Sequence, residues 1–302
     1  MNLRFLQAIV AIAEQPSFTA AASALGLSHS AISLQVKTLE EELQLQIVDR
    51  TTRPPTLTDT GLALVEHARR MLKIADDIRA LTSDDSLVGT VTIGVVPSVL
   101  VNLIPPALAR LRLAHPKLLV RIRSGLSGEL AQAVRSRDID LAVVSEPRVL
   151  PDGLASFPIC QEPLNVIVPH SMAEAADEDV LRAHPFIWFN RRTWAGQQIE
   201  QHLLDRKIHV QPVMEIDSIE AVESLVAHGL GISITPTRAC APDSGNQLRR
   251  IPFGTPQKHR SLLMVMLEKG PRQRLAETLL RELQQLTDQD SQFSKNVDAR
   301  CK

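Results

Sequence analysis

The sequence predicts an all-α N-terminal domain, a long connecting helix and a C-terminal α/β domain built from two similar subdomains. Three observations carry this prediction. Two short amphipathic segments meet at Gly26, a regular apolar spacing runs through residues 59–81, and strand and helix patterns alternate from Thr90 onwards. At 302 residues the chain is too long for one small core, so we expect more than one domain.

Residues 17–43 predict two helices joined by a short turn. Ser17 begins the first helix, and Gly26 ends it because glycine readily takes a left-handed C-terminal turn. Ser28 is a good N-cap for the second helix. The apolar stripe of that helix consists of Ile32, Val36, Leu39 and Leu43. Helices joined so closely cross steeply, as in a helix-turn-helix unit, whose second helix offers its N-terminal residues to base edges in the major groove.

Residues 44–58 predict a two-stranded wing. Two β-prone pieces cover 47–50 and 56–58, and Pro54 and Pro55 force a turn between them. The net charge of residues 1–58 gives no support for a nucleic-acid partner, because four basic residues face five acidic ones. The basic residues are Arg4, Lys37, Arg50 and Arg53, and the acidic ones are Glu14, Glu40, Glu41, Glu42 and Asp49.

The stretch from about residue 59 to 81 predicts one long helix with an apolar seam. The seam residues are spaced four, three, four and three apart, and they are Leu64, Ala68, Met71, Ala75 and Ile78. The seam could pack on its own domain, but it lies between two domains, so pairing with a second chain is the expected use. Two paired chains would place their recognition helices about one turn of DNA apart, on an approximate inverted repeat.

Beyond a hinge at residues 82–90, strand and helix patterns alternate. Strands are expected at 91–95, 118–123, 140–145, 165–169, 186–190, 210–216, 231–235 and 261–267. Helices are expected at 105–114, 128–137, 180–183, 193–205, 219–228 and 272–286. Strands separated by such helices form parallel sheets with right-handed crossovers, so we expect two Rossmann-like blocks that meet near 161–164 and 268–271.

These patterns set the expected domain boundaries. They are 1–58 for the winged domain, 59–87 for the linker helix and hinge, 88–287 for the C-terminal domain and 288–302 for a polar, flexible tail. Within the C-terminal domain, subdomain I is expected to contain 90–163 and 268–287, and subdomain II to contain 164–267.

A cleft between the two blocks is the expected ligand site, because ligands of open α/β sheets bind where strand ends meet helix N-termini. Hydroxyl, amide and backbone N–H groups there suit a small anion. The candidate contacts are Ser98, Ser127, Ser145, Asn190 and Thr235. Each residue could instead simply end a strand or cap a helix. Phe189 and Trp194 could line the cleft, although large aromatic residues are more often part of a core.

Composition narrows the class of protein. Ordinary hydrophobic content (44%) and a net charge of −1 exclude a disordered or fibrous chain. Three widely spaced cysteines, Cys160, Cys240 and Cys301, argue against a disulfide framework or a zinc site. No apolar run is long enough to span a bilayer, and no secretory signal is recognisable. We therefore expect a soluble cytoplasmic protein with reduced thiols, no metal, no cofactor and no membrane partner.

Two alternatives use the same α/β architecture. An enzyme is one, but Gly125-Leu126-Ser127-Gly128-Glu129 has Glu129 where a nucleophile elbow needs its second glycine. No complete dinucleotide loop, phosphate-binding loop or HExxH pattern occurs either. A solute-binding protein of a transporter is the other, but it would have no use for the N-terminal helical domain.

The strings AAASALGLSHSAISLQVKTLEEEL and DRTTRPPTLTDTG, in the order helix, helix-turn-helix and wing, closely resemble the LysR-type family of bacterial transcriptional regulators. The resemblance is specific over about the first sixty residues, and order and length fit over about 290. It implies a DNA-binding regulator that dimerises through its linker helix and can pair into tetramers. It also implies an effector in the cleft of a periplasmic-binding-protein-like domain, whose closure changes the grip on DNA, and RNA polymerase as a further partner.

The resemblance also implies roles for single residues. His29, Ser30, Ser33 and Leu34 are expected at base edges or the groove wall. The expected phosphate contacts are Gln35, Lys37, Arg50, Thr51 and Arg53. The chain departs from the family pattern, with His29-Ser30 in place of Gln-Pro and Leu34 in place of Arg. Further departures are Gln44 in place of a helix-ending Gly and Ile47-Val48 in place of Leu-Phe. The operator sequence therefore cannot be carried over from the family.

Overall fold

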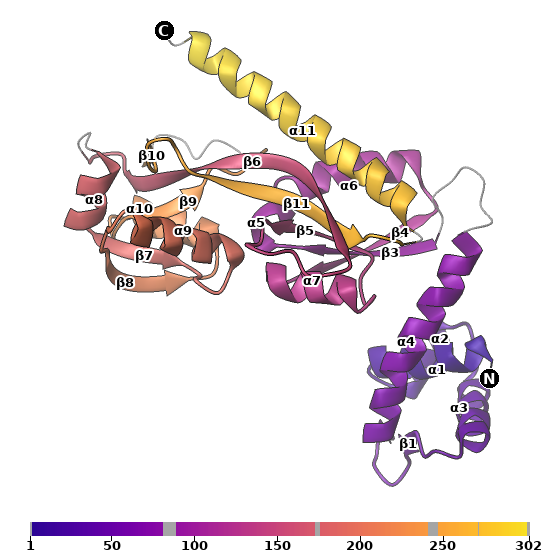
Figure 1. The fold of residues 1–302 in the computed structure, drawn as a ribbon. Coiled ribbons are helices and arrows are strands. Elements are labelled where there is room, and N and C mark those ends of the chain that lie inside the picture. Colours follow the sequence, from indigo (N-terminus) through magenta and orange to yellow (C-terminus); the bar gives the residue numbers. More distant parts are fainter. Residues whose placement is uncertain (1, 81–88, 173–175, 241–246, 271, 301–302) are drawn as a thin grey trace. The chain divides into compact units, whose positions relative to one another are not determined.

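A computed structural model describes residues 2–80, 89–172, 176–240, 247–270 and 272–300 of the chain (Figure 1). The chain divides into two compact units, Met1–Asp84 and Asp85–Lys302. They are called the N-terminal unit and the C-terminal unit below. The predicted hinge at 82–90 lies almost entirely outside the described residues, which resume at Gly89.

The N-terminal unit has the predicted winged helix-turn-helix order. Its elements are α1 (Leu3–Glu14), α2 (Phe18–Ala24), α3 (His29–Leu43), β1 (Val48–Asp49), β2 (Thr56–Leu57) and α4 (Asp59–Ala80). Both expected caps are confirmed: Ser17 Oγ accepts from the N–H of Ala20, and Ser28 Oγ accepts from the N–H of Ala31. Gly26 has φ +66°, the left-handed conformation that lets the chain turn between α2 and α3.

The core of this unit lies between α1, α3, α4 and the wing. Its fully buried side chains include Leu6, Ile9, Ile32, Val36, Leu39 and Ile47. β1 and β2 pair antiparallel, with Val48 opposite Leu57. The start of α4 approaches this wing so closely that a Cβ atom on Gly61 would lie 2.3 Å from the carbonyl oxygen of Ile47. Only glycine fits there, so the wing rests directly on α4.

The predicted seam of α4 is only partly exposed. Ala68 is 1% exposed and belongs to the core of its own unit, against which Leu64 also packs. Met71 and Ile78 are exposed as predicted, and Ala75 is half-buried. Ile74, which the sequence analysis did not include, is 51% exposed. In the second half of α4 the exposed apolar positions are Met71, Ile74 and Ile78, whereas Val65 and Ala68 of the first half belong to the core of their own unit.

The C-terminal unit is built on one long mixed sheet and a small parallel one. The large sheet has the order β10-β6-β11-β5-β3-β4, and β9 also pairs with β6. Its strands are β3 (Gly89–Val95), β4 (Leu118–Ser124), β5 (Leu141–Ser145), β6 (Leu154–Pro169), β9 (Ser233–Pro236), β10 (Leu248–Pro252) and β11 (His259–Leu267). The small sheet pairs β7 (Pro185–Phe189) with β8 (Gln211–Ile216).

The long strand β6 joins two lobes. Its first half pairs with β11 up to the pair Pro163–His259, and its second half pairs with β9 and β10 from Leu164 onwards. Lobe I contains residues 89–163, 259–270 and 272–300, and lobe II contains the described residues of 164–258. The first predicted boundary, near 161–164, coincides with this exchange of partners.

The second predicted boundary differs from the structure. β11 pairs with β5 through Leu262–Ser145 and its neighbours, so Ser261–Leu267 lies in lobe I rather than in subdomain II. The expectation of two parallel sheets is also only partly right. β3 is parallel to β4 and β5, and β7 is parallel to β8, but β6, β9, β10 and β11 are antiparallel to their neighbours. β11 enters lobe I beside the first half of β6 and antiparallel to it, so the sheet is mixed.

Helices cover both faces of each lobe. In lobe I, α6 (Ile104–Ala114) and α11 (Gln273–Arg300) pack together on one face, α7 (Ser127–Arg135) lies on the other, and α5 (Pro97–Leu100) follows β3 (Figure 1). In lobe II the helices are α8 (Asp177–Ala183), α9 (Trp194–Asp205) and α10 (Ile219–Ala227). Within the described residues, no helix is both long and apolar enough to cross a membrane.

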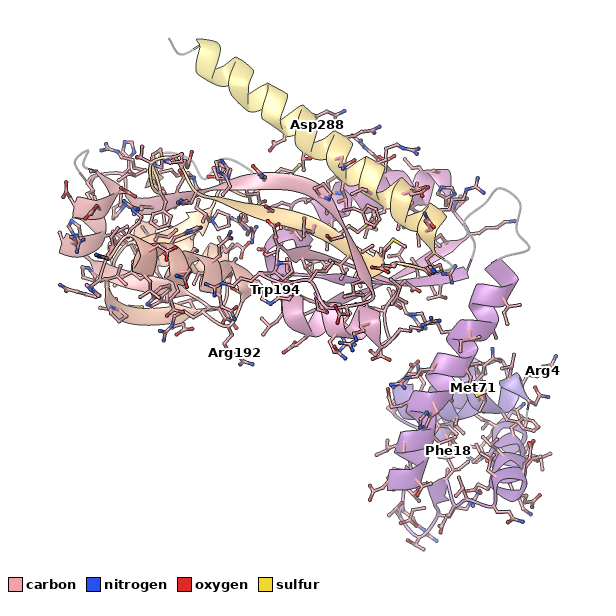
Figure 2. All side chains as sticks on the ribbon, viewed as in Figure 1. Arg4, Phe18, Met71, Arg192, Trp194 and Asp288 are labelled. Atoms are coloured by element: carbon pink, nitrogen blue, oxygen red, sulfur yellow. The ribbon has the colours of Figure 1, made fainter. Side chains whose placement is uncertain are left out.

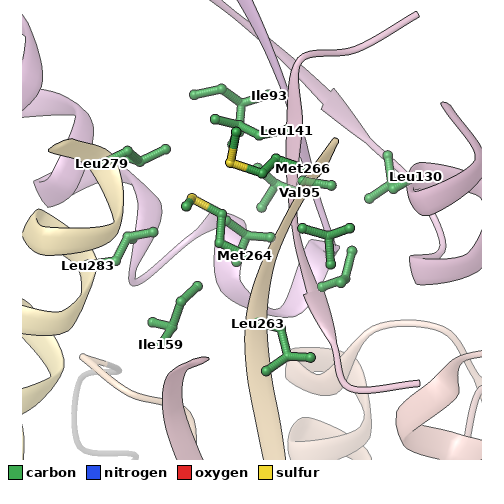
Figure 3. Packing of buried hydrophobic residues seen from close by; sticks show 14 of the residues in the cluster. Ile93, Val95, Leu130, Leu141, Ile159, Leu263, Met264, Met266, Leu279 and Leu283 are labelled. Atoms are coloured by element: carbon green, nitrogen blue, oxygen red, sulfur yellow. The ribbon is translucent and has the colours of Figure 1, made fainter. Parts of the chain in front are cut away.

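The core of lobe I fixes α11 to the sheet. Met264 and Met266 of β11 lie beside Val95 and Leu141, and Leu279 and Leu283 of α11 close the same cluster (Figure 3). α11 is helical as far as Arg300, where the sequence analysis expected a flexible tail from residue 288. The polar composition of that segment suggested a tail without structure, but a helix that is anchored at one end can continue as a polar helix.

Candidate functional site

The outward face of α3 is the first candidate site. Ile32, Val36 and Leu39 are completely buried, so the opposite side of the helix faces outward. Ser30, Ser33, Leu34 and Lys37 line an open groove there. We call this groove the recognition surface; its remaining residues are Glu40, Glu41, Gln44, Leu45, Gln46 and Arg50. Leu34 is 64% exposed and lines this groove.

A second hollow adjoins the recognition surface at the start of α3. It is lined by Ser17, Phe18, Thr19, His29, Ser33, Val48, Arg50, Pro54 and Pro55. Figure 2 places Phe18 within this unit. Ser33 and Arg50 line both hollows, so helix and wing together form one continuous surface.

Most of the predicted DNA-contact residues lie on this surface, and three do not line it. Thr51 and Arg53 are exposed in the wing outside both hollows. The Thr51 hydroxyl donates to Asp49 Oδ1 at 2.6 Å, which orders the start of the wing loop. Gln35 is half-buried, and its side-chain oxygen is buried without a hydrogen-bond partner. The side-chain oxygen of Gln35 therefore points into its own unit, and the expected phosphate contact through its amide N–H groups stays a prediction.

Acidic side chains partner the basic groups of the recognition surface. Lys37 Nζ lies 3.7 Å from Glu41, and both side chains are 66% exposed, so this pair is weak. Arg50 Nη2 lies 2.8 Å from Glu40 Oε2. Lys37 can exchange its exposed carboxylate partner for a phosphate at little cost, whereas Arg50 is held by the mostly buried Glu40. A net charge near zero is thus compatible with a usable phosphate-binding group at Lys37.

Glu40 joins the recognition helix to the wing. Its Oε1 accepts hydrogen bonds from the N–H groups of Ile47 and Val48 at 2.9 and 3.0 Å, and its Oε2 accepts from Arg50. Burial by itself raises the pKa of this carboxyl, but the hydrogen bonds from Val48, Arg50 and Ile47 outweigh burial and lower the pKa below 4.5. The sequence analysis counted Glu40 only as a charge. A glutamate that follows the apolar stripe of a helix gives no local sign of a partner seven residues further on.

We expect Glu40→Ala to lower the free energy of unfolding of the N-terminal unit by about 1–3 kcal/mol, because two backbone N–H groups and Arg50 lose a charged acceptor. Both tryptophans, Trp188 and Trp194, lie in the other unit. Urea unfolding of this unit is therefore measured as a circular dichroism change without a change in tryptophan fluorescence. The matched control is Glu41→Ala, which removes only an exposed pair and should change stability by less than about 0.5 kcal/mol. Equal effects of the two variants would contradict the anchoring role.

The same anchor predicts a pH dependence. A carboxyl whose pKa is lowered in the folded state stabilises the fold above its unfolded pKa, and this stabilisation is lost as pH falls. Starting from neutral pH, the contribution of Glu40 should begin to decline near pH 4.5 and vanish below its lowered folded pKa. The stability difference between the wild type and Glu40→Ala should therefore shrink over this acidic range.

The second candidate site is a cavity of about 350 Å³ between lobes I and II. The ends of β3 and β5, the N-terminal ends of α5, α7, α9 and α10, and the end of β7 form it. Its apolar wall consists of Val96, Pro97, Leu100, Val101, Leu126, Phe189, Ala195 and Ile219. Four of the five predicted contacts, Ser98, Ser127, Ser145 and Asn190, line it. The sequence therefore predicted the position of this cavity from strand ends and helix starts.

Thr235 is the exception. It lies on β9 opposite Asn165 of β6, is fully buried, and does not line the cavity. β9 is short and occupies the far side of β6, which removes Thr235 from the end where the lobes meet. Trp194 does not line the cavity either, but a Cβ atom on Gly128 of α7 would lie 3.5 Å from its indole Nε1. Trp194 thus contacts lobe I from lobe II, where Figure 2 shows it between α9 and α7.

A buried ion pair forms the deep end of the cavity. Arg260 of β11 lines the cavity and donates from Nε to Glu162 Oε2 at 2.9 Å, and its Nη2 makes a second bond to the same oxygen. Its Nη1 donates to the hydroxyl of Ser98 at 2.9 Å. Glu162 also accepts from the N–H of Ala239, and Glu162 and Arg260 are each 1% exposed. This pair joins β6 and β11 to the first residues of α5.

The other polar groups of the cavity are held by the backbone or have no partner. Ser127 Oγ accepts from the N–H of Ser145 at 3.3 Å. The Ser145 hydroxyl is on a residue that is only 4% exposed and makes no hydrogen bond to the described residues. Asn190 Oδ1 accepts from the N–H of Arg192, and the Thr193 hydroxyl donates to the Asn190 carbonyl oxygen. Ser145 is the group most clearly available to a ligand.

Features of an enzyme or metal site are missing from the described part of the chain. No histidine is among the described residues that line the cavity beside Ser127. No cluster of His, Cys, Asp and Glu within the described ranges could hold a metal ion. Cys160 and Cys240 are free thiols, and Cys301 is outside the described residues. Burial, reinforced by the nearby Glu162, raises the pKa of Cys160 to about 12, so it is a poor nucleophile.

Comparison with known proteins matches both units. Residues 84–288 match the family model "LysR substrate binding domain", and residues 3–62 match "Bacterial regulatory helix-turn-helix protein, lysR family". A probable RuBisCO transcriptional regulator of Chlorokybus atmophyticus is 30% identical over 241 residues, 76% of this chain and 77% of that protein. The protein of the same name from Synechocystis sp. is 27% identical and covers 97% of this chain and 87% of its own length.

Solved structures agree with the fold. A full-length OxyR variant from Pseudomonas aeruginosa has a TM-score of 0.68, with 24% identity and 94% coverage of each chain. Full-length CbnR, solved in complex with its target DNA, has a TM-score of 0.67 and 23% identity, and covers 96% of this chain and all of its own.

Proposed function

This chain belongs to the LysR family of bacterial transcriptional regulators, and we propose that it binds one operator sequence through α3 and the wing under the control of a small molecule held between lobes I and II. The helix-turn-helix domain is its DNA-binding domain, and the C-terminal unit is its effector-binding domain. The observation that carries the proposal is the division of α3 into a fully buried apolar stripe and an outward face with no packing role.

The residues of the recognition surface support two separate roles on DNA, base contact and phosphate contact. Ser30, Ser33 and His29 can hydrogen-bond to base edges, and Leu34 can contact a thymine methyl group. Lys37 and Arg50, with Arg53 and Thr51 of the wing, would bind phosphates and set the register of the helix in the groove. Gln35 would add a phosphate contact through its amide N–H groups, since only its side-chain oxygen is buried without a partner.

We further propose that two chains pair through α4. Met71, Ile74 and Ile78 form an exposed apolar stripe with spacing three and four, and a helix in water gains from covering such a stripe. Pairing would place two copies of α3 in successive major grooves, so the operator would be an approximate inverted repeat. Pairing of dimers into tetramers and contact with RNA polymerase are further parts of the proposal, which uses no cofactor and no catalytic step.

Replacing Ile74 by glutamate should convert the dimer into a monomer at micromolar concentration, because two like charges would meet in an apolar seam. Size-exclusion chromatography with light scattering measures the mass directly. Leu62→Glu is the matched control: Leu62 is also exposed on α4, but 12 positions from Ile74 it lies about a third of a turn away. A dimeric Ile74→Glu variant, or equal effects of both variants, would contradict the proposed seam.

Selection of genomic DNA fragments by the purified chain tests the proposed function as a whole. The bound fragments should share an approximate inverted repeat with half-sites about 10 base pairs apart, centre to centre, or a multiple of this. If the bound fragments share no sequence, the chain binds DNA but recognises no operator, which contradicts the proposed sequence specificity. If no fragment is retained, the proposed function is wrong.

A further inference from the structure

We propose that the ligand of the cavity is a small α-amino acid with an apolar side chain, recognised by its carboxylate at the deep end and by its ammonium group at the mouth. This inference rests on the proposed function, because it assigns the chemical class of the effector.

The deep end of the cavity offers hydrogen-bond donors without net charge. Arg260 is neutralised by Glu162, and Ser98, Ser127 and Ser145 line the same cavity. Ser145 is more than nine-tenths buried, lines the cavity and has an unused hydroxyl. The Ser145 hydroxyl is not among the described polar atoms that are sealed from solvent without a partner, so it is open to the cavity and can donate to a ligand. A carboxylate fits this end of the cavity, because its two oxygens can accept hydrogen bonds from several hydroxyl groups at once.

The mouth of the cavity is acidic on both sides. Glu129 of α7 reaches it from lobe I, and Asp217, just before α10, reaches it from lobe II. Both side chains are exposed, and no cation within the described residues pairs with either of them. Glu220 also lines the cavity, but Arg238 neutralises it. Two uncompensated negative charges therefore face a ligand that enters, and they oppose a simple anion.

The preference of helix N-termini for acidic residues explains the position of only some of these carboxylates. Glu129 and Glu220 lie in the first turns of α7 and α10, where negative charge stabilises any helix. Asp217 is outside α10, before the N-cap Ser218, and it lines the same cavity as Glu129, from the other lobe. An ammonium group between the two carboxylates would bring the lobes together, which links the charge of the ligand to closure of the cavity.

The walls select an apolar side chain. The lining between the deep end and the mouth includes the apolar residues Leu100, Val101, Leu126, Phe189 and Ile219. Among the described lining residues, the charged ones are Glu129, Asp217, Glu220 and Arg260. A volume of about 350 Å³ suits a small molecule that is enclosed on most sides.

The test compares matched probes on the full chain. Leucine and phenylalanine are each measured beside the acid without the amine, 4-methylpentanoate or 3-phenylpropanoate, and beside the amine without the acid, 3-methylbutylamine or 2-phenylethylamine. The other standard amino acids complete the panel. Binding is followed by calorimetry and by the fluorescence of Trp194 in a Trp188→Phe variant, because Trp194 contacts Gly128 across the two lobes.

At least one amino acid with an apolar side chain should bind, and the matched acid without the amine should bind at least about tenfold more weakly. Asp217→Asn and Glu129→Gln should each weaken the amino acid about threefold to tenfold and leave or improve the binding of the matched acid. The control Glu277→Gln changes an exposed acid on α11 that does not line the cavity and should change neither.

The inference is overturned if no amino acid binds, or if the acid without the amine binds as tightly as the amino acid and Asp217→Asn strengthens it. In the latter case the cavity remains an effector site for a simple anion and the proposed function stands. Selection of operator DNA does not depend on any of these ligands, so failure of the proposed function would be seen separately.

Discussion

Replacing Arg260 by alanine should lower the free energy of unfolding of the C-terminal unit by about 3–5 kcal/mol, because Glu162 would keep its charge inside the protein without its cation. Arg260 and Glu162 are both almost completely buried, and the N–H of Ala239 would remain as the one described hydrogen-bond donor to Glu162. Urea unfolding followed by tryptophan fluorescence measures the loss in this unit, since both tryptophans belong to it.

Two controls separate burial from charge. Arg191→Ala removes an arginine that also makes two ion pairs, with Glu200 and Glu215, but whose side chain is half exposed, so the loss should stay below about 1 kcal/mol. Replacing both Arg260 and Glu162 by methionine removes the pair without leaving one charge behind, so it should recover much of the stability lost in Arg260→Ala. A loss below 1 kcal/mol in Arg260→Ala would show that the pair is not isolated from water.

Replacing Lys37 by alanine should weaken binding to every DNA sequence and reduce the slope of log affinity against log salt by about 1, since one phosphate contact releases about one counterion. Arg53→Ala should behave in the same way if the wing reaches the backbone. Ser33→Ala should instead change the preferred sequence, with a cost of about 1–3 kcal/mol confined to one base position. Both effects are measured by titrating labelled operator variants at several salt concentrations.

Lys117→Ala removes an exposed lysine of the C-terminal unit and should leave both the slope and the preference unchanged. A Lys37→Ala variant with the wild-type salt slope would place α3 away from the phosphates. A Ser33→Ala variant with an unchanged preference would leave the bases to other residues of the recognition surface.

Local signals in the sequence were enough for the N-terminal unit. Ser17, Gly26 and Ser28 mark helix ends by short-range chemistry, and the structure confirms all three. The seam of α4 was harder to predict, because periodicity says that Ala68 and Ile78 share a face but not that only Ala68 is packed into the core of its own unit. Whether other elements of the unit pack over a helix face depends on the tertiary structure, and a 3.5-residue spacing of apolar residues does not predict it.

In the C-terminal unit, long-range pairing limited the prediction. The first half of β6 contains Pro158 and Pro163, which read as breaks in a strand, and β10 contains Arg249 and Arg250, which hide its alternation. The strand of residues 261–267 was predicted, but its neighbour was not, because the pair Leu262–Ser145 joins residues far apart in the chain. Element type could thus be predicted locally, whereas sheet order could not.

The cavity shows the same limit. Ser98, Ser127, Ser145 and Asn190 could be predicted because each ends a strand or begins a helix, but Arg260 and Glu162 meet only through the pairing of β6 with β11. One signal was available in the sequence: Arg260 stands at the start of a strongly apolar run, where a charged residue needs a buried partner. The sequence does not say that this partner is Glu162.

The uninterrupted course of β6 has a practical consequence for dissecting the molecule. A cut between Pro163 and Leu164 would separate the lobes in sequence, but each fragment would keep half of a ladder whose backbone N–H and C=O groups had lost their continuation. Unpaired strand edges of this kind form hydrogen bonds with strands of other molecules. Isolated lobes should therefore precipitate or swap segments, and limited proteolysis should spare this peptide bond while the ladder is intact.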